Sequence, residues 1–271
     1  MNSNQLLDAI GLINDEAIQD AKTYRRSKPY YGVKLFLIAA AIVLLSTTAM
    51  AAAWILLRPA EVPKQFNNHT LSDAFDSEKA IIINDSITSG EYTFTLMAVV
   101  NGEGISDYFG TAVERQPERT FVILAVQNAD GTPIQMETFD DELSQLMVSP
   151  LVKGLEPLWV NVASMGGSAS SCLVDGVVYR LVECDSFMMF ADRGLYLGVC
   201  SSPFIMLDTF KFDKITGEIT ANPDSPGINI VFDLPVDASY ADPERAEQYL
   251  EQLYHELGLD DVLAASENST P

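Results

Sequence analysis

A run of 23 uncharged residues, Leu35–Leu57, constrains this chain more than any other feature of its sequence. At a rise of about 1.5 Å per residue, a helix of this length reaches about 34 Å, more than a hydrocarbon core of about 30 Å. Backbone polar groups within lipid must be satisfied inside the segment, as a helix does. The run therefore predicts a membrane-spanning helix over residues 35–57.

The flanking charges predict how this helix is oriented. Five basic residues lie within positions 1–34, whereas Arg58 alone closely follows the run. The positive-inside rule then places the N-terminus in the cytoplasm and the C-terminal domain outside, in a single-pass protein of the cell membrane. The alternative is a signal peptide cleaved near Ala49–Ala51. The 34 residues before its apolar region would, however, be too long for the basic N-terminal region of a signal peptide. A buried core helix would carry a polar face, which the run lacks.

The charge of the chain is strongly acidic and unevenly distributed. The sequence holds 38 Asp and Glu against 16 Lys and Arg, and residues 59–271 alone hold 34 acidic and 10 basic residues. Phosphate binding needs clustered basic side chains, so we expect no direct contact with nucleic acid. The acidic residues lack the spacing of a calcium-binding loop, and we expect neither a metal nor a cofactor.

The first 34 residues are expected to form a short helical tail in the cytoplasm. Caps at Ser3 or Asn4 and at Asn14 or Asp15, with a break at Gly11, favour two short amphipathic helices. Short isolated helices are marginal in water, so their apolar side chains need cover. Self-packing, the bilayer surface and a partner's groove all remain open. In the last case, the partner-binding residues are Leu6, Leu7, Ile10, Ile13 and Ile18.

The tail also resembles a known kind of regulator. The run LLDAIGLINDEAIQDA, followed by basic residues and one apolar span, resembles the N-terminus of anti-sigma-factor-like membrane proteins of Gram-positive bacteria, including uncharacterised families with a β-rich outer domain. The resemblance covers about 57 residues. It implies a tail that holds a sigma factor and an outer module that senses. Zinc-binding members carry a His-x3-Cys-x2-Cys ligand set, but residues 1–34 contain neither His nor Cys, so sigma binding here would be zinc-free.

Beyond the apolar run, the sequence changes to short strands separated by turns. Residues 58–79 contain two prolines and no sustained period, which predicts a stalk. Residues 80–236 are predicted to form an antiparallel β-sandwich, so the fold class is mainly β. The expected strands are Ala80–Ile83, Glu91–Val100, a central Thr120–Val126, Leu158–Ala163, Cys172–Val174, Val177–Val182, Gly194–Cys200, Phe204–Phe210 and Ile228–Phe232.

Turn and cap residues refine this prediction. Asp175-Gly176 favours a type I′ turn and a tight hairpin, and Thr216-Gly217 predicts a second hairpin tip. Asp242-Pro243 has the pattern of a helix N-terminus, and Gly258 that of a stop. Residues 237–271 should therefore hold one amphipathic helix, packed on the β domain or left for a partner, followed by a frayed end.

Residues that could carry catalysis are scarce. His69 lies in the expected stalk and His255 on the expected final helix, and neither is near a nucleophile in sequence. Residues 164–168 lack the nucleophile-elbow pattern, and Ser168–Ser171 indicates a flexible loop in which a catalytic serine is a minor alternative. No phosphate-binding or zinc-protease motif occurs. The sequence therefore carries no enzyme signature.

The cysteines leave the redox state open. Cys172, Cys184 and Cys200 would lie on the oxidising side of a membrane, and their number is odd. Within a two-residue Asp175-Gly176 hairpin, Cys172 faces Tyr179, so a Cys172–Cys184 bridge needs a bend beyond the hairpin. A Cys184–Cys200 bridge is equally allowed, as are three buried thiols.

Two functions are consistent with these patterns. The first is a membrane-anchored regulator of transcription and signal transduction that sequesters a sigma factor through its tail and senses through its outer domain. The second is an anchored envelope binding or adhesion module whose tail has no regulatory role. Neither identifies the external ligand.

Overall fold

A computed structural model describes residues 56–103, 118–202 and 204–259, apart from the side chain of Glu142. Ten strands occur in this part of the chain: β1 (Ile81–Ser89), β2 (Tyr92–Glu103), β3 (Glu118–Asn128), β4 (Met147–Val152), β5 (Ser168–Val174), β6 (Val177–Asp185), β7 (Leu195–Cys200), β8 (Phe210–Phe212), β9 (Ile219–Ala221) and β10 (Asn229–Leu234). The helical elements are η1 (Pro59–Glu61), η2 (Pro63–Phe66), α4 (His69–Phe75), α5 (Met136–Thr138), η3 (Phe139–Leu143), η4 (Met188–Phe190), η5 (Ala238–Tyr240) and α6 (Pro243–Glu256).

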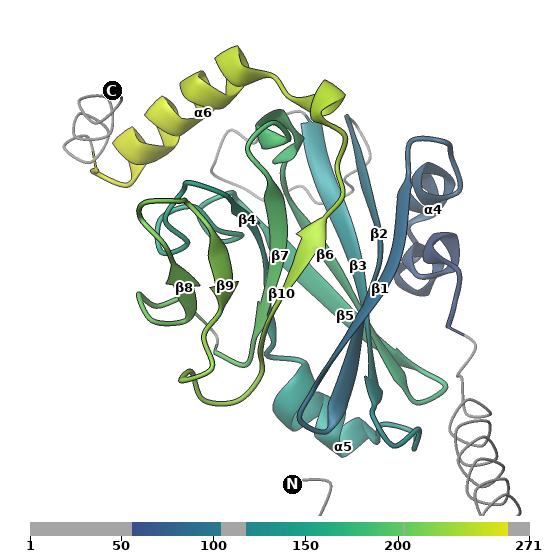
Figure 1. Ribbon diagram of the computed structural model, residues 1–271. Coiled ribbons are helices and arrows are strands. Elements are labelled where there is room, and N and C mark those ends of the chain that lie inside the picture. The colour runs from purple at the N-terminus through teal and green to yellow at the C-terminus, as the bar shows by residue number, and fades with distance from the viewer. Residues whose placement is uncertain (1–55, 104–117, 203, 260–271) are drawn as a thin grey trace, which may run out of the picture. The chain divides into compact units, whose positions relative to one another are not determined.

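The strands form three antiparallel sheets (Figure 1). The largest has the order β1-β2-β3-β6-β5, the second β10-β7-β4, and the third is the β8–β9 hairpin. β3 lies at the centre of the five-stranded sheet and is buried on both faces, as its unbroken apolar run predicts. The predicted mainly β, antiparallel fold class is therefore confirmed.

The turn between β5 and β6 forms as its sequence predicts. Asp175 and Gly176 have φ angles of 49° and 77°, which are the positive values that a type I′ turn requires. Cys172 is the register partner of Tyr179, as expected from a two-residue loop. A side chain at Gly176 would also collide with Pro133, because an added Cβ would lie 2.5 Å from the Pro133 Cβ. Only glycine satisfies both demands at this position.

Three clusters of buried side chains hold the domain together. The main core includes Phe94 and Leu124 from the five-stranded sheet and Leu197 and Phe232 from the three-stranded sheet. An outer cluster covers the other face of the five-stranded sheet, around Phe121 and Tyr179. A hairpin cluster joins β8 and β9 to the strands beneath them and consists of Leu151, Tyr196, Cys200, Ile205, Phe210 and Ile219.

The predicted stalk, residues 58–79, is instead folded onto the sheet. It forms η1, η2 and α4, and its side chains Val62, Leu71 and Phe75 are at most 3% exposed within the outer cluster. Asn68 caps α4 by accepting a hydrogen bond from the backbone N–H of Leu71 at 2.8 Å. The apolar residues are too few to show a period in the sequence, but they suffice to cover one face of a sheet.

The structure corrects the predicted single-pass membrane architecture and localisation. In the described part of the chain, no helix is long and apolar enough to cross a membrane. The longest described helix, α6, has 14 residues, about 21 Å of rise. Residues 35–55 of the predicted span lie outside the described residues, while Leu56 and Leu57 pack against the outer cluster. Leu57 donates its backbone N–H to the Tyr179 hydroxyl at 2.9 Å, so the end of the predicted span belongs to the β domain.

The predicted C-terminal helix is confirmed as α6. The Asp242 side chain accepts a hydrogen bond from the backbone N–H of Arg245 at 3.1 Å, and Pro243 occupies the first helical turn. One face packs on the main core through Ala246, Tyr249, Leu250, Leu253 and Tyr254. Packing on the domain, rather than an open face, is the alternative that the structure selects.

Two strand predictions and one loop prediction are wrong. Leu158–Ala163 forms turns, because the Asn161 amide donates to the carbonyl oxygens of Pro157 and Leu158, at 2.9 and 3.1 Å. In Phe204–Phe210, no strand forms before Phe210, and residues 207–209 form a turn; the Thr209 hydroxyl accepts a hydrogen bond from the Met206 N–H at 2.7 Å. Ser168–Ser171, expected as a loop, begins β5, and β4 was not expected at all.

Candidate functional site

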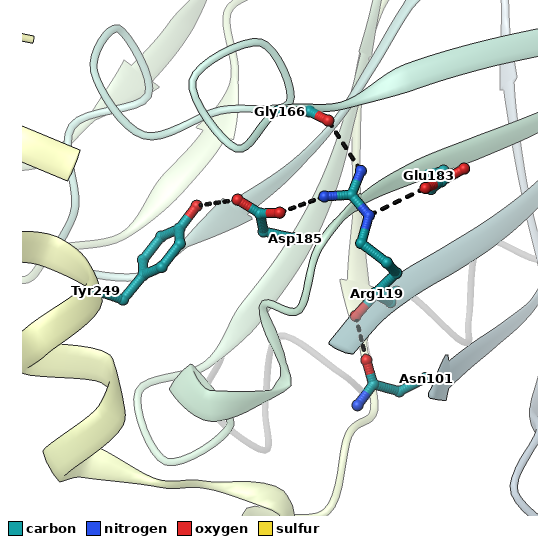
Figure 2. Close-up of polar contacts among 7 residues, drawn as sticks. Asn101, Arg119, Gly166, Glu183, Asp185 and Tyr249 are labelled. Carbon is teal, nitrogen blue, oxygen red and sulfur yellow. Dashed lines mark hydrogen bonds and ion pairs between the residues drawn. The ribbon is translucent and has the colours of Figure 1, made fainter. Parts of the chain in front are cut away.

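A buried polar network lies where β3 begins and β6 ends (Figure 2). Arg119 is 3% exposed, and its Nε donates to Glu183 Oε1 at 3.0 Å while Nη1 donates to Asp185 Oδ1. Its Nη2 donates to the Gly166 carbonyl oxygen at 2.8 Å. The Tyr249 hydroxyl donates to the other oxygen of Asp185 at 3.1 Å. All three guanidinium nitrogens are thus engaged.

Strand register brings these residues together. Arg119 is paired directly with Asp185, and Glu183 lies two residues earlier on the same face of β6. A buried guanidinium is tolerated only when it is paired and hydrogen-bonded, which two carboxylates and a carbonyl achieve here. Burial, and secondarily the charge of Asp185, raise the pKa of the Tyr249 hydroxyl and keep it protonated as a donor.

A second set of contacts continues the network toward α6. Glu118 accepts a hydrogen bond from Asn101 Nδ2 at 2.6 Å and an ion pair from Arg245. Thr120 donates its hydroxyl to Asn101 Oδ1 at 2.7 Å. The network therefore ties three parts of the fold to one another: the β2 and β3 ends, the turn before β5, and the C-terminal helix.

This network has the chemistry of a structural tie. Its carboxylates are committed to Arg119, Arg245 and Tyr249, and no histidine takes part in the contacts described above. His69 and His255 are exposed on α4 and α6. Among the described residues, no group of three or more His, Cys, Asp and Glu could hold a metal. We therefore place the candidate functional site elsewhere, on the surface.

An apolar patch lies on the segment that precedes β8. It consists of Phe204, Met206 and Leu207, whose side chains are 69%, 58% and 73% exposed. Ile205, between them, is buried in the hairpin cluster and fixes the segment to the domain. Large exposed apolar side chains gathered at one place mark interaction sites, whereas single ones are ordinary. This patch is the candidate functional site.

A groove adjoins the apolar patch along the β8–β9 hairpin. Its volume is about 670 Å³, and its lining joins Leu207 to Phe210 and Phe212. The polar lining is mostly acidic, with Asp208, Asp213 and Glu218 against Lys211; Thr216, Thr220 and Asn222 complete it. At the tip of the hairpin, Ile215 is 96% exposed. The surface thus combines apolar anchors with an acidic border.

The hairpin that forms one wall of the groove is held in place by Glu218. Its carboxylate accepts hydrogen bonds from Lys153 Nζ and from the Tyr196 hydroxyl. The bond from Lys153, followed by the bond from Tyr196, lowers the pKa of the Glu218 carboxyl. Burial raises the pKa of Tyr196, and the Glu218 carboxylate adds to the effect. The groove wall is therefore anchored to the residue that directly follows β4 and to β7.

The residues predicted as sites fall outside this surface. Leu6, Leu7, Ile10, Ile13 and Ile18 lie outside the described residues. Cys172, Cys184 and Cys200 are free thiols and pack in the outer cluster, the main core and the hairpin cluster respectively, so no two of them belong to one cluster. Burial raises the pKa of all three thiols, for Cys172 to about 11.

The apolar patch was not expected from the sequence, because the apolar run Phe204–Phe210 predicted a strand. One signal could have found it. Phe204-Ile205-Met206-Leu207 is apolar at every position, whereas a strand covering the domain surface alternates apolar and polar residues. If this run formed a strand, both faces of that strand would have to be covered. Without such cover, a continuous apolar run followed directly by Asp208 indicates exposed apolar side chains.

Comparison with protein-family models, with curated proteins and with solved structures finds no match to this chain. The comparisons therefore give no support to the anti-sigma-factor role that the tail resemblance implied. Binding of a sigma factor by the tail depends on residues 1–34 and stays a prediction from the sequence. The described domain has to be interpreted from its own surface.

Proposed function

We propose that the described domain is a binding module, without catalytic activity, that recognises a partner protein through the apolar patch and the adjoining groove. The carrying observation is the exposure of Phe204, Met206 and Leu207 within four consecutive residues. Aromatic residues and methionine are enriched in protein interfaces, and clustered exposure costs solubility unless a partner covers it. We also infer that the two larger sheets, which share the main core, form the expected β-sandwich.

The support for this surface is both mechanical and electrostatic. Buried Ile205 and the anchored hairpin hold the exposed side chains on a rigid base, which lowers the entropy cost of binding. The acidic border of Asp208, Asp213 and Glu218 favours a partner with apolar anchors flanked by basic residues. The binding class agrees with the second function expected from the sequence, without any assignment of location.

The test uses the full-length chain in its native host with a photo-crosslinking amino acid at Leu207. We expect a discrete crosslinked product whose partner is identified by mass spectrometry. The matched control carries the crosslinker at Ile82, which is exposed to 52% on β1 but has no place in the apolar patch. Phe204→Asp combined with Met206→Asp should abolish the product at Leu207. Equal products at positions 207 and 82, or none at 207, contradict the proposal.

A further inference from the structure

We propose that the outer edge of β5 binds an extended, basic segment of a partner protein, which joins the five-stranded sheet as a sixth strand. β5 ends this sheet, so β6 pairs with one side of its backbone. In the described part of the chain, no strand pairs with the other side. Edge strands with unpaired N–H and C=O groups are templates for such additions. This site is independent of the apolar patch.

The register with β6 identifies the backbone groups that point outward. Val174 and Val177 flank the two-residue turn and therefore exchange backbone hydrogen bonds with each other. Because hydrogen-bonded and non-hydrogen-bonded pairs alternate along an antiparallel ladder, the N–H and C=O groups of Ala169, Ser171 and Leu173 point away from β6. These three residues present a regular row of donors and acceptors.

The edges of the two larger sheets other than β5 carry features that oppose strand addition. β1 has a register shift between Ile82 and Asp85, and Asn84 there has a φ of 56°. β4 contains Pro150, which has no N–H. β10 lies against β1 and β9. β5 alone among these edges has seven residues in continuous register with no proline, glycine or charged residue.

Charge selects the occupant. The chain carries a net charge of −22, which opposes pairing with a second copy of itself. Asp175 follows β5 directly, and its carboxylate is exposed in the turn to β6. Arg180 is committed to the Ser144 carbonyl and the Ser171 hydroxyl, both at 2.9 Å. A partner strand with lysine or arginine side chains would complement this acidic surface.

The probe is a library of displayed 12-residue peptides, selected on the immobilised full-length chain. We expect enriched peptides that alternate apolar and basic residues, bind more weakly as salt rises, and slow hydrogen exchange in residues 168–174. Ala169→Pro removes one outward N–H and sets a proline ring at the edge, which should weaken binding at least about fivefold. Ala169→Val keeps the N–H and suits a strand, so it should bind as the wild type does.

Each of the following outcomes would overturn the proposal of a binding site at the β5 edge. The proposal is wrong if no peptide is enriched, or if enriched peptides bind Ala169→Pro and wild-type chains equally while both variants unfold at the wild-type temperature. Peptides lost instead in Leu207→Asp bind the apolar patch, which would support the proposed function and not this one. Self-association that Ala169→Pro abolishes would assign the edge to a second copy, against the charge argument. Failure of crosslinking at Leu207 leaves this test unaffected.

Discussion

Tyr249 of α6 donates its hydroxyl hydrogen bond to Asp185 of β6, 64 residues earlier in the chain. The same carboxylate holds Arg119, so one acidic side chain links the C-terminal helix to the centre of the five-stranded sheet. The helix is thereby fastened by a polar contact as well as by its apolar face. The Tyr249 hydroxyl therefore contributes to the attachment of α6 alongside the apolar face of the helix.

Tyr249→Phe removes that hydroxyl and should lower the free energy of unfolding by about 1–3 kcal/mol, since a buried carboxylate loses one hydrogen-bond donor. Urea denaturation measures the change. The matched control is Tyr254→Phe on the same helix, because the Tyr254 hydroxyl has no hydrogen-bond partner among the described residues. The control should change stability by less than about 0.5 kcal/mol. Equal losses in the two variants would contradict the role of the Asp185 contact.

Arg119→Met should be more damaging, because it leaves Glu183 and Asp185 without their shared cation in a buried site. We expect a loss of about 3–5 kcal/mol in the free energy of unfolding. Adding Glu183→Gln and Asp185→Asn to Arg119→Met should recover part of that loss, since no unpaired buried charge remains. A triple variant less stable than Arg119→Met alone would show that charge imbalance is not the cause.

A chain that starts at Ile81 should be far less stable than one that starts at Trp54. The longer one keeps the compact unit that begins at residue 54, whereas the shorter one uncovers the outer cluster. Within the longer chain, Leu71→Ala alone should cost about 2–5 kcal/mol, because Leu71 is fully buried. Urea denaturation of both chains measures the difference in stability. Equal stability would mean that residues 58–79 do not stabilise the domain, as a stalk would not.

Stability should fall as the pH rises above about 9. Burial raises the pKa of the Cys172 thiol from 9.0 to about 11, so in this range the unfolded chain loses a proton that the folded chain retains. A group of this kind contributes full stability below its unfolded pKa and loses it as the pH rises through its folded pKa. Urea midpoints from pH 8 to 11 measure the effect. Cys172→Ala should make the decline shallower, and an unchanged slope would contradict it.

The thiols should also be slow to react. In native protein at pH 8, an alkylating reagent should modify Cys172 slowly, because its raised pKa leaves little thiolate. The same reagent should leave the buried Cys184 and Cys200 unmodified. Unfolding in urea without reductant should expose three reactive thiols. Mass spectrometry after alkylation counts them, and a count of one would reveal a disulfide.

Local signals predicted those elements whose causes lie within a few residues. The Asp175-Gly176 turn and the Asp242-Pro243 start of α6 are of this kind, since one turn type or one cap decides each. The Arg119 network is different, because Arg119 meets Glu183 and Asp185 only when β3 and β6 pair in one register. The stalk error has the same origin: Leu71 and Phe75 have meaning only opposite a sheet face. The apolar run Leu158–Ala163 predicted a strand, but the Asn161 side-chain amide donates a hydrogen bond to the backbone within this segment and stabilises turns instead.

The Leu57 N–H donates a hydrogen bond to the Tyr179 hydroxyl and so joins the start of the described chain to β6. A mechanical load on the preceding backbone would enter the domain through this bond. Tension on the backbone ahead of Leu57 pulls on this bond and on the side chains of the outer cluster before it reaches any strand end-on. Because η1, η2 and α4 are joined to the five-stranded sheet through side chains, we expect a pull at Leu57 to detach them before the strands of that sheet separate.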